Sequence, residues 1–179
     1  DNLIVAASMS ELFAAGRIVR PRVYSIDPKD LPDLSGISIT GGDYNLKQLS
    51  AVFSKKPLVG HIVEHWLQRA EGRQTIVAAT SLAHGAMIAA EFREHGVAAE
   101  TIDGTMSNTQ RGDILARFGR REYPVLVQCE LLIEGIDIPD VKCIVMARRT
   151  LSLTINLQII GRSVRPAGDQ TAIVLDHAG

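Results

Sequence analysis

The hydrophobic positions of the chain change their spacing near Pro57. Before this point, prolines and paired glycines interrupt the sequence and the pattern is irregular. After it, short apolar runs alternate with segments in which apolar residues recur every three or four positions. We therefore predict an arm, or interdomain connection, over residues 1–52 and a folded domain over residues 53–179.

The domain is expected to alternate about five times between strand and helix. Helices are predicted over residues 58–70, 81–95, 107–118 and 151–164, and strands over residues 75–79, 97–102, 124–129, 141–147 and 171–176. In the arm, a short helix over residues 9–15 and an extended piece over residues 20–24 are expected, and loops follow. Nearly continuous apolar strands joined by helices are typical of a parallel sheet covered on both faces. The predicted fold class is therefore α/β.

Ligands of such sheets bind beyond the carboxyl ends of the strands. The residues to inspect therefore follow the predicted strands, around Thr80, Asp103, Cys129, Arg148 and Asp176.

The composition excludes several classes of protein. The chain has 179 residues, of which 46% are hydrophobic and 22% charged, so it is not a disordered protein. No apolar run approaches the roughly 18–20 residues that a membrane span requires. The sequence begins without methionine, and we expect a fragment of a longer chain. Its two cysteines lie in apolar runs, which argues against a disulfide framework and for a cytoplasmic protein.

The charge is close to balanced but unevenly distributed. A net charge of -1 excludes a globally basic nucleic-acid binder. However, residues 148–168 carry four arginines and no acid, which predicts a local anion site. The chain contains no Gly-Lys pair and no Asp-Glu pair, so the Walker A loop and the Walker B carboxylates are missing.

A possible zinc motif is present on the first predicted helix of the domain. His61, Glu64 and His65 match the pattern H-x-x-E-H, and residues four apart share a helix face. A zinc site needs at least a third protein ligand, and the nearby sequence offers none. We therefore interpret these residues as a solvated polar face and expect no metal site.

Three segments carry candidate chemistry. Gly135 and Asp137 form a Gly-x-Asp-x-Pro turn after a predicted strand, where the carboxylate can accept from a sugar hydroxyl, although an ordinary capped turn explains the same residues. Arg162 and Arg165 are three apart and share a helix face, where two guanidiniums can clamp an oxyanion. A solvated arginine pair at a helix end is the alternative.

The third segment is a strand that runs into Thr80 and Ser81 at a predicted helix start. Hydroxyls and free N–H groups at a helix N-terminus suit a phosphate. Taken alone, the pair is better explained as a simple helix cap.

Taken in chain order and with this spacing, the segments at Thr80, at Gly135 and at Arg162 resemble motifs IV, V and VI of superfamily 2 helicases. The resemblance covers about residues 54–179, the second RecA-like motor domain, and its most specific part is Gln158-x-x-Gly161-Arg162-x-x-Arg165-Pro166. Gln158 with Arg165-Pro166 is closer to the XPB-like and restriction-motor branch than to the DEAD-box RNA helicases. The arm then resembles the stretch that follows the first motor domain.

The resemblance implies roles for five residues around a nucleotide. Arg165 corresponds to the arginine finger that reaches the γ-phosphate, and Arg162 to a second phosphate-contacting arginine. Gly135 and Asp137 correspond to motif V positions near the ribose and the domain interface, and Gln158 to the polar first position of motif VI, which makes all three candidate cofactor-binding residues. The implied cofactor is ATP with Mg²⁺, bound mainly by a first motor domain of the same polypeptide.

The resemblance also implies contacts to a nucleic-acid strand. Thr80, Ser81, Gly104, Arg111 and Cys129 fall where the neighbouring motifs meet its backbone, and DNA is the expected partner, with RNA as the alternative. Cys129 stands where many members have a threonine, and a thiol is a weak donor. Two further departures are Ile159 and Glu134, where arginines are common.

The function implied is that of a second motor domain in an ATP-dependent DNA helicase or translocase, with no membrane partner. A finger arginine supplies roughly 10³–10⁵ in rate. The fragment alone is expected to be inactive. Two alternatives stay open: a non-catalytic RecA-like module that binds nucleic acid or protein, and an unrelated transferase with an arginine phosphate pocket.

Overall fold

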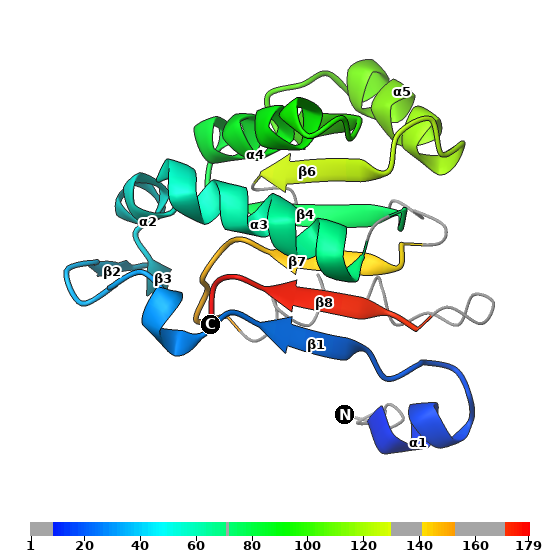
Figure 1. Cartoon of the computed structure of the whole chain (residues 1–179), viewed down its shortest axis with the longest axis horizontal. Helices are drawn as coiled ribbons and strands as arrows, with labels where there is room; N and C mark the ends of the chain where they lie inside the picture. Colours follow the sequence, from blue (N-terminus) through cyan, green and yellow to red (C-terminus); the bar gives the residue numbers. More distant parts are fainter. Residues whose placement is uncertain (1–8, 71, 130–140, 153–170) are drawn as a thin grey trace, which may run out of the picture.

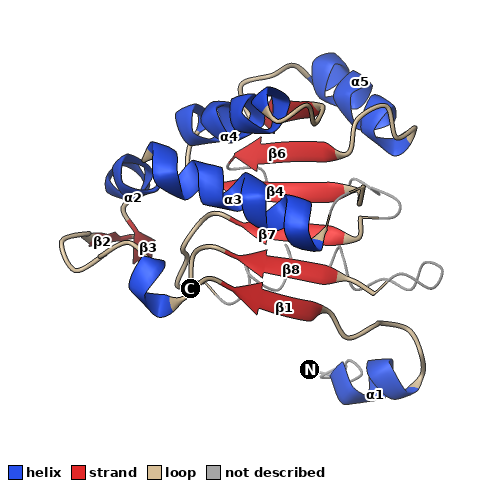
Figure 2. Cartoon of the chain, in the orientation of Figure 1, coloured by secondary structure: helices blue, strands red, loops and turns tan. Residues whose placement is uncertain are grey.

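The computed structural model describes residues 9–70, 72–129, 141–152 and 171–179. These residues form a six-stranded sheet in the order β1-β8-β7-β4-β6-β5, and all of its neighbouring strands are parallel (Figure 1, Figure 2). The strands are β1 (Arg22–Ser25), β4 (Thr75–Ala79), β5 (Ala99–Asp103), β6 (Val125–Cys129), β7 (Cys143–Met146) and β8 (Ile173–Asp176). The predicted α/β fold with a parallel sheet is confirmed.

Helices cover both faces of the sheet. On one face, α3 (Lys56–Arg69) and α4 (Leu82–Glu94) pack their apolar side chains against the strands, and Val77 and Ala79 point toward them. On the other face, α5 (Asn108–Gly119) packs against Ile76 and Ala78. Because successive strand residues face opposite sides and both sides are covered, all five residues of β4 are buried.

The helix ends follow the signals in the sequence. Ser81 caps α4 and Ser107 caps α5, where Gln110 completes a capping box. Gly96 follows α4 with a φ of +75°, a conformation that glycine adopts without strain. The predicted helix over residues 151–164 lies mostly outside the described residues.

The arm is more closely attached to the domain than its sequence indicated. Its strand β1 lies at the edge of the sheet, pairs with β8 and is the extended piece predicted near residue 22. The sequence did not predict the hairpin of β2 (Ile39–Thr40) and β3 (Asp43–Tyr44) or the helix α2 (Leu46–Phe53).

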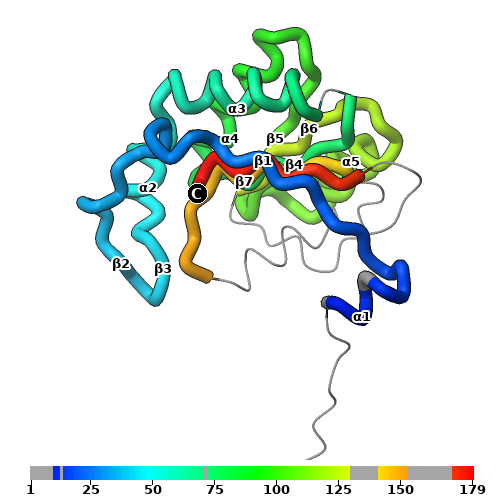
Figure 3. The backbone as a smooth tube through the Cα atoms, turned by 60° about the horizontal axis from the view of Figure 1, so that its bottom comes forward, coloured from blue at the N-terminus to red at the C-terminus, as the bar shows by residue number. Residues whose placement is uncertain are grey.

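The hairpin and α2 lie beyond the carboxyl ends of the strands, at the end of the sheet where the chain also terminates in the structure (Figure 1, Figure 3). Leu49 and Phe53 of α2 form a small apolar cluster with Ala178, which follows β8. The division of the chain at residue 52 stays a prediction, although part of the arm is built into the sheet. Among the described residues, no helix has the length and apolar character needed to cross a bilayer.

Trp66 is the largest buried side chain between the sheet and the two helices α3 and α4 that cover one of its faces. It is 1% exposed, its ring meets Phe92 edge-on at 5.4 Å, and its indole N–H donates to Thr75 Oγ1 at 2.7 Å. Trp66 therefore ties α3 both to α4 and to the first residue of β4.

We predict that Trp66→Phe lowers the free energy of unfolding by about 1–3 kcal/mol, because it removes a buried hydrogen bond and leaves a cavity. The exposed Leu82→Ala variant is the control and should change it by less than about 0.5 kcal/mol. Urea unfolding followed by circular dichroism measures both. Equal losses in the two variants would contradict the assignment of Trp66 to the core.

Candidate functional site

Three of the predicted site positions meet at one edge of the sheet. Cys129 at the end of β6 pairs in register with Ala79 at the end of β4 and with Asp103 at the end of β5. Thr80 and Gly104 are the next residues after these two partners. The parallel register therefore brings Thr80, Gly104 and Cys129 to the carboxyl ends of neighbouring strands.

Thr80 and Ser81 hold the N-terminus of α4. Thr80 is 0% exposed, its hydroxyl lies 2.9 Å from His84 Nδ1, and its backbone N–H donates to the same nitrogen at 3.3 Å. Ser81 Oγ accepts from the His84 backbone N–H at 3.1 Å and lies 2.5 Å from Ser50 Oγ of α2. Both hydroxyls thus bond within the protein, and a phosphate contact from either stays a prediction.

Gly104 and Arg111 lie on the exposed side of the same edge. Asp103 Oδ1 accepts from the backbone N–H of Thr105 at 2.7 Å and from its hydroxyl at 2.5 Å, which makes a tight turn around the exposed Gly104. Arg111 lies in the first turn of α5 and donates to Asn108 Oδ1 at 2.5 Å. Among the described residues other than its two chain neighbours, no atom lies within 4 Å of the Cβ position that Gly104 lacks, and Gly104 itself is exposed.

Cys129 is buried, with 3% of its surface exposed, and it takes part in no disulfide. It is the last described residue before the gap at 130–140. Its proposed contact with a nucleic-acid strand stays a prediction.

Five predicted site residues lie outside the described part of the chain. They are the oxyanion pair Arg162 and Arg165 and the nucleotide-facing Gln158, Gly135 and Asp137. Their roles therefore stay predictions.

The first two arginines of the predicted anion site are described, and both have partners. Arg148 Nη2 lies 3.6 Å from Asp43 Oδ2, and Arg149 Nη1 donates to the Ala178 carbonyl at 2.7 Å. No acidic residue lies near Arg148 in the sequence, but Asp43 of the arm lies beside it in space. Sequence proximity does not reveal this partner.

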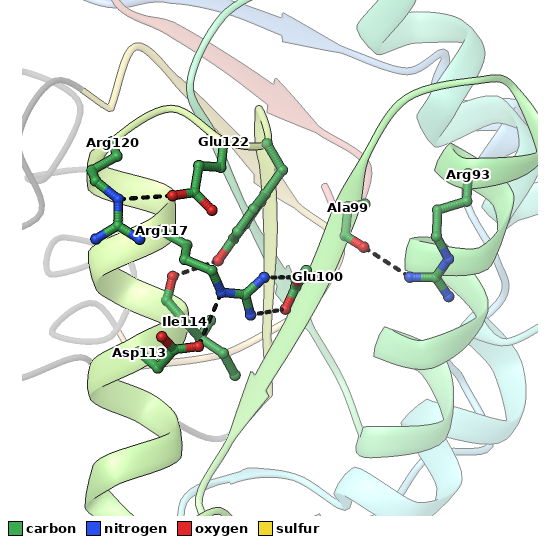
Figure 4. Close-up of polar contacts among 9 residues, drawn as sticks. Arg93, Ala99, Glu100, Asp113, Ile114, Arg117, Arg120 and Glu122 are labelled. Atoms are coloured by element: carbon green, nitrogen blue, oxygen red, sulfur yellow. Dashed lines mark hydrogen bonds and ion pairs between the residues drawn. The ribbon is translucent and has the colours of Figure 1, made fainter.

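An ion-pair network that the sequence did not reveal fixes the edge strand β5. Arg117 of α5 donates to both carboxylate oxygens of Glu100 on β5, at 2.5 and 2.9 Å, and to Asp113 at 3.0 Å (Figure 4). These bonds raise the pKa of Arg117. From the other side, Arg93 of α4 donates to the Ala99 carbonyl at 2.8 Å. The strand that ends at Asp103 is thereby held to the helices on both faces.

In the structure, His65 of the H-x-x-E-H pattern lies beside His177, which follows β8. His65 Nδ1 lies 3.2 Å from His177 Nε2, and both line a cavity of about 350 Å³ together with His61 and Glu64. Within the described residues, no three histidine, cysteine, aspartate or glutamate side chains are grouped so that they could hold a metal ion.

The family described as the helicase conserved C-terminal domain matches residues 57–167. The chain belongs to this family. The match covers the strand ends at Thr80, Gly104 and Cys129 and the segment with Arg162 and Arg165, and the predicted resemblance to superfamily 2 helicase C-terminal domains is confirmed.

Curated relatives match nearly the whole chain or a large part of it. The chain is 28% identical over 177 residues to the 51.5 kDa protein of a Lactococcus phage, which covers 99% of this chain and 38% of that protein. It is 27% identical over 136 residues to the putative ATP-dependent helicase IRC3 of Saccharomyces cerevisiae, covering 74% and 20%. The chain thus spans well under half the length of these relatives.

Solved structures show the same fold. A fragment of a putative HsdR subunit of a type I restriction enzyme from Vibrio vulnificus has a TM-score of 0.68 at 20% identity, covering 92% of this chain and 33% of that one. The helicase domain of Hef from Pyrococcus furiosus has a TM-score of 0.51 at 26% identity, covering 67% and 25%. The RecA-like arrangement expected from the sequence is confirmed.

Two buried histidines make the stability of the domain depend on pH. Burial lowers the pKa of His84 to about 4, and burial together with His65 and His61 lowers that of His177 to about 3. In the unfolded chain both titrate near about 6.5. Between pH 6.5 and these lower pKa values, the folded state therefore binds fewer protons than the unfolded state. The free energy of unfolding is thus highest above pH 6.5 and decreases as the pH falls.

We predict a loss of up to about 1.4 kcal/mol per pH unit for each of the two histidines below pH 6.5. His177→Gln should reduce the slope of the unfolding free energy against pH relative to that of the wild type. Urea unfolding at several pH values between 7.5 and 5 measures the slope. A wild-type slope in His177→Gln would contradict the assignment.

Proposed function

We propose that this chain is the second motor domain of an ATP-dependent superfamily 2 DNA helicase or translocase. The observation that carries the proposal is the family match over residues 57–167, which includes Arg162 and Arg165 in the spacing of motif VI. The parallel sheet supports it, because its carboxyl edge gathers the candidate strand-contacting residues.

In this proposal, Arg165 reaches the γ-phosphate of ATP from across a cleft, and Arg162 contacts a second phosphate oxygen. Phosphoryl transfer develops charge on the γ-phosphate oxygens, and guanidinium groups stabilise that charge. Gln158, Gly135 and Asp137 line the nucleotide side of the cleft. ATP and Mg²⁺ are held mainly by an N-terminal motor domain of the same polypeptide, because this chain has no Gly-Lys pair to form a Walker A loop.

The nucleic-acid strand lies along the carboxyl edge near Thr80, Ser81, Gly104, Arg111 and Cys129. The exposed backbone at Gly104 and the guanidinium of Arg111 contact phosphates, and such contacts grip a strand without reading its bases. DNA is the proposed strand and RNA the alternative, since proteins named as ATP-dependent RNA helicases also match the chain. A cytoplasmic location is part of the same proposal.

Placing the arginines and the Walker loop on separate domains makes hydrolysis depend on closure of the two domains. Closure then changes the grip on the strand with each nucleotide state, and this coupling converts hydrolysis into movement. A RecA-like module that only binds nucleic acid or protein would not need both arginines.

We predict that Arg165→Ala in the intact enzyme lowers strand-stimulated ATP hydrolysis by about 10³-fold or more, while ATP affinity changes by less than about ten-fold. The control is Arg120→Ala, which removes an exposed arginine of the same domain whose partner is the neighbouring Glu122. Steady-state ATPase assays and binding of a labelled nucleotide measure the two quantities. The isolated 179-residue chain should show no hydrolysis.

Normal turnover in Arg165→Ala would refute the finger role. An intact enzyme that binds a strand but hydrolyses no ATP would favour the non-catalytic module instead.

A further inference from the structure

Asp43 joins the arm to the segment that leaves β7. Its carboxylate accepts from the Thr150 hydroxyl at 2.6 Å and from the Leu151 backbone N–H at 2.8 Å. The guanidinium of Arg148 lies 3.6 Å away. Asp43 and Thr150 are 107 residues apart in sequence, so a single side chain of the hairpin fixes a distant piece of backbone.

These contacts hold an ionised carboxylate in a shielded place. The side chain of Asp43 is 20% exposed and that of Arg148 is 15% exposed. Burial alone raises the pKa of Asp43, but the bonds from Thr150, Leu151 and Tyr44 and the charge of Arg148 outweigh it and keep the pKa below its ordinary value. Charge-assisted hydrogen bonds of this kind are about twice as strong as neutral ones.

The bond from Thr150 to Asp43 also orders the backbone two residues later, at Ser152. Because the Thr150 hydroxyl gives its proton to Asp43, its lone pairs are free to accept, and they accept from the Ser152 backbone N–H at 3.1 Å. Thr150 is 9% exposed, so water competes poorly for this chain of bonds. Through these hydrogen bonds, Asp43 fixes the backbone conformation from Thr150 to Ser152.

We propose that Asp43 is a positioning residue for the ATPase reaction, acting through Thr150 on the backbone that leaves β7. The proposal rests on the proposed function, because Ser152 directly precedes in sequence the stretch that carries Gln158, Arg162 and Arg165. Catalytic groups need placement within fractions of an ångström, so the direction in which the chain leaves Ser152 affects the rate of the chemical step. In this proposal Asp43 acts through Thr150 and makes no contact of its own with the nucleotide or the strand.

The arm also supplies a matched control. Asp33 accepts from the backbone N–H of Ser35 at 2.9 Å and from its hydroxyl at 3.0 Å. It is thus an aspartate of the same arm with the same two types of donor, but its partner is two residues away and does not belong to the domain.

The experiment measures strand-stimulated ATP hydrolysis of the intact enzyme with Asp43→Asn and with Thr150→Val. We expect each to lower kcat by about ten-fold while the KM for ATP stays within about two-fold, because placement rather than ATP binding is lost. The kcat of the double variant should be at most about two-fold lower than that of either single variant, because the two substitutions break the same chain of hydrogen bonds. Thr150→Ser, which keeps the hydroxyl, and Asp33→Asn should keep the wild-type kcat.

All assays are run where circular dichroism shows every variant folded, so loss of fold does not enter the comparison. A wild-type kcat in Asp43→Asn and Thr150→Val, or an equal loss in Asp33→Asn, would overturn the proposal. The Arg165→Ala variant separates failure of this proposal from failure of the proposed function. If only the role of Asp43 is wrong, Arg165→Ala still abolishes ATP hydrolysis. If Arg165→Ala hydrolyses ATP at the normal rate, the arginine-finger role is wrong.

Discussion

A parallel sheet is stable in water only when helices cover both of its faces, and this constraint organises the protein. The central strands β4, β6 and β7 are buried throughout and mostly apolar, with Thr75 at the start of β4 and Gln128 near the end of β6 as their polar residues. Polar side chains are therefore concentrated near the ends of the strands. Because parallel strands end at the same edge, the register that packs the core also brings the ends of β4, β5 and β6 together.

Most elements of the domain could be predicted because each is long and strongly patterned. The strand ending at Cys129 and the helix capped by Ser107 carry their signals within a few residues. The hairpin at Asp43 and the helix α2 were missed because they are short and their apolar residues are few. Leu49 and Phe53 form their apolar cluster with Ala178, which lies near the other end of the sequence, and with partly buried residues of the arm.

For the candidate site, the sequence predicted the positions of some residues but not their interaction partners. The meeting of Thr80, Gly104 and Cys129 follows from parallel strands and needs no contact information. The hydrogen-bond partners at this site did not follow from the sequence: Thr80 bonds to His84 in the first turn of α4, and the neighbouring Ser81 bonds to Ser50 of the arm. The ion pair of Arg148 with Asp43 is likewise a product of the fold, because no local pattern joins positions so far apart in sequence.

The arm is therefore part of the machinery around the carboxyl edge. Its edge strand extends the sheet, its helix α2 contacts the start of α4 through Ser50, and its hairpin holds the chain after β7. In the proposed two-domain enzyme, an arm attached in this way moves with the second motor domain. Relative motion of the two domains is then expected to be taken up before β1, whose first residue is Arg22.

The central claim is that this domain completes an ATP site held by another domain. The most direct measurement is an experimental structure of the intact enzyme with a non-hydrolysable ATP analogue and a single strand bound. The account predicts the Arg165 guanidinium within hydrogen-bonding distance of a γ-phosphate oxygen. A closed complex in which Arg165 points away from the nucleotide, with the γ-phosphate contacted only by the other domain, would contradict it.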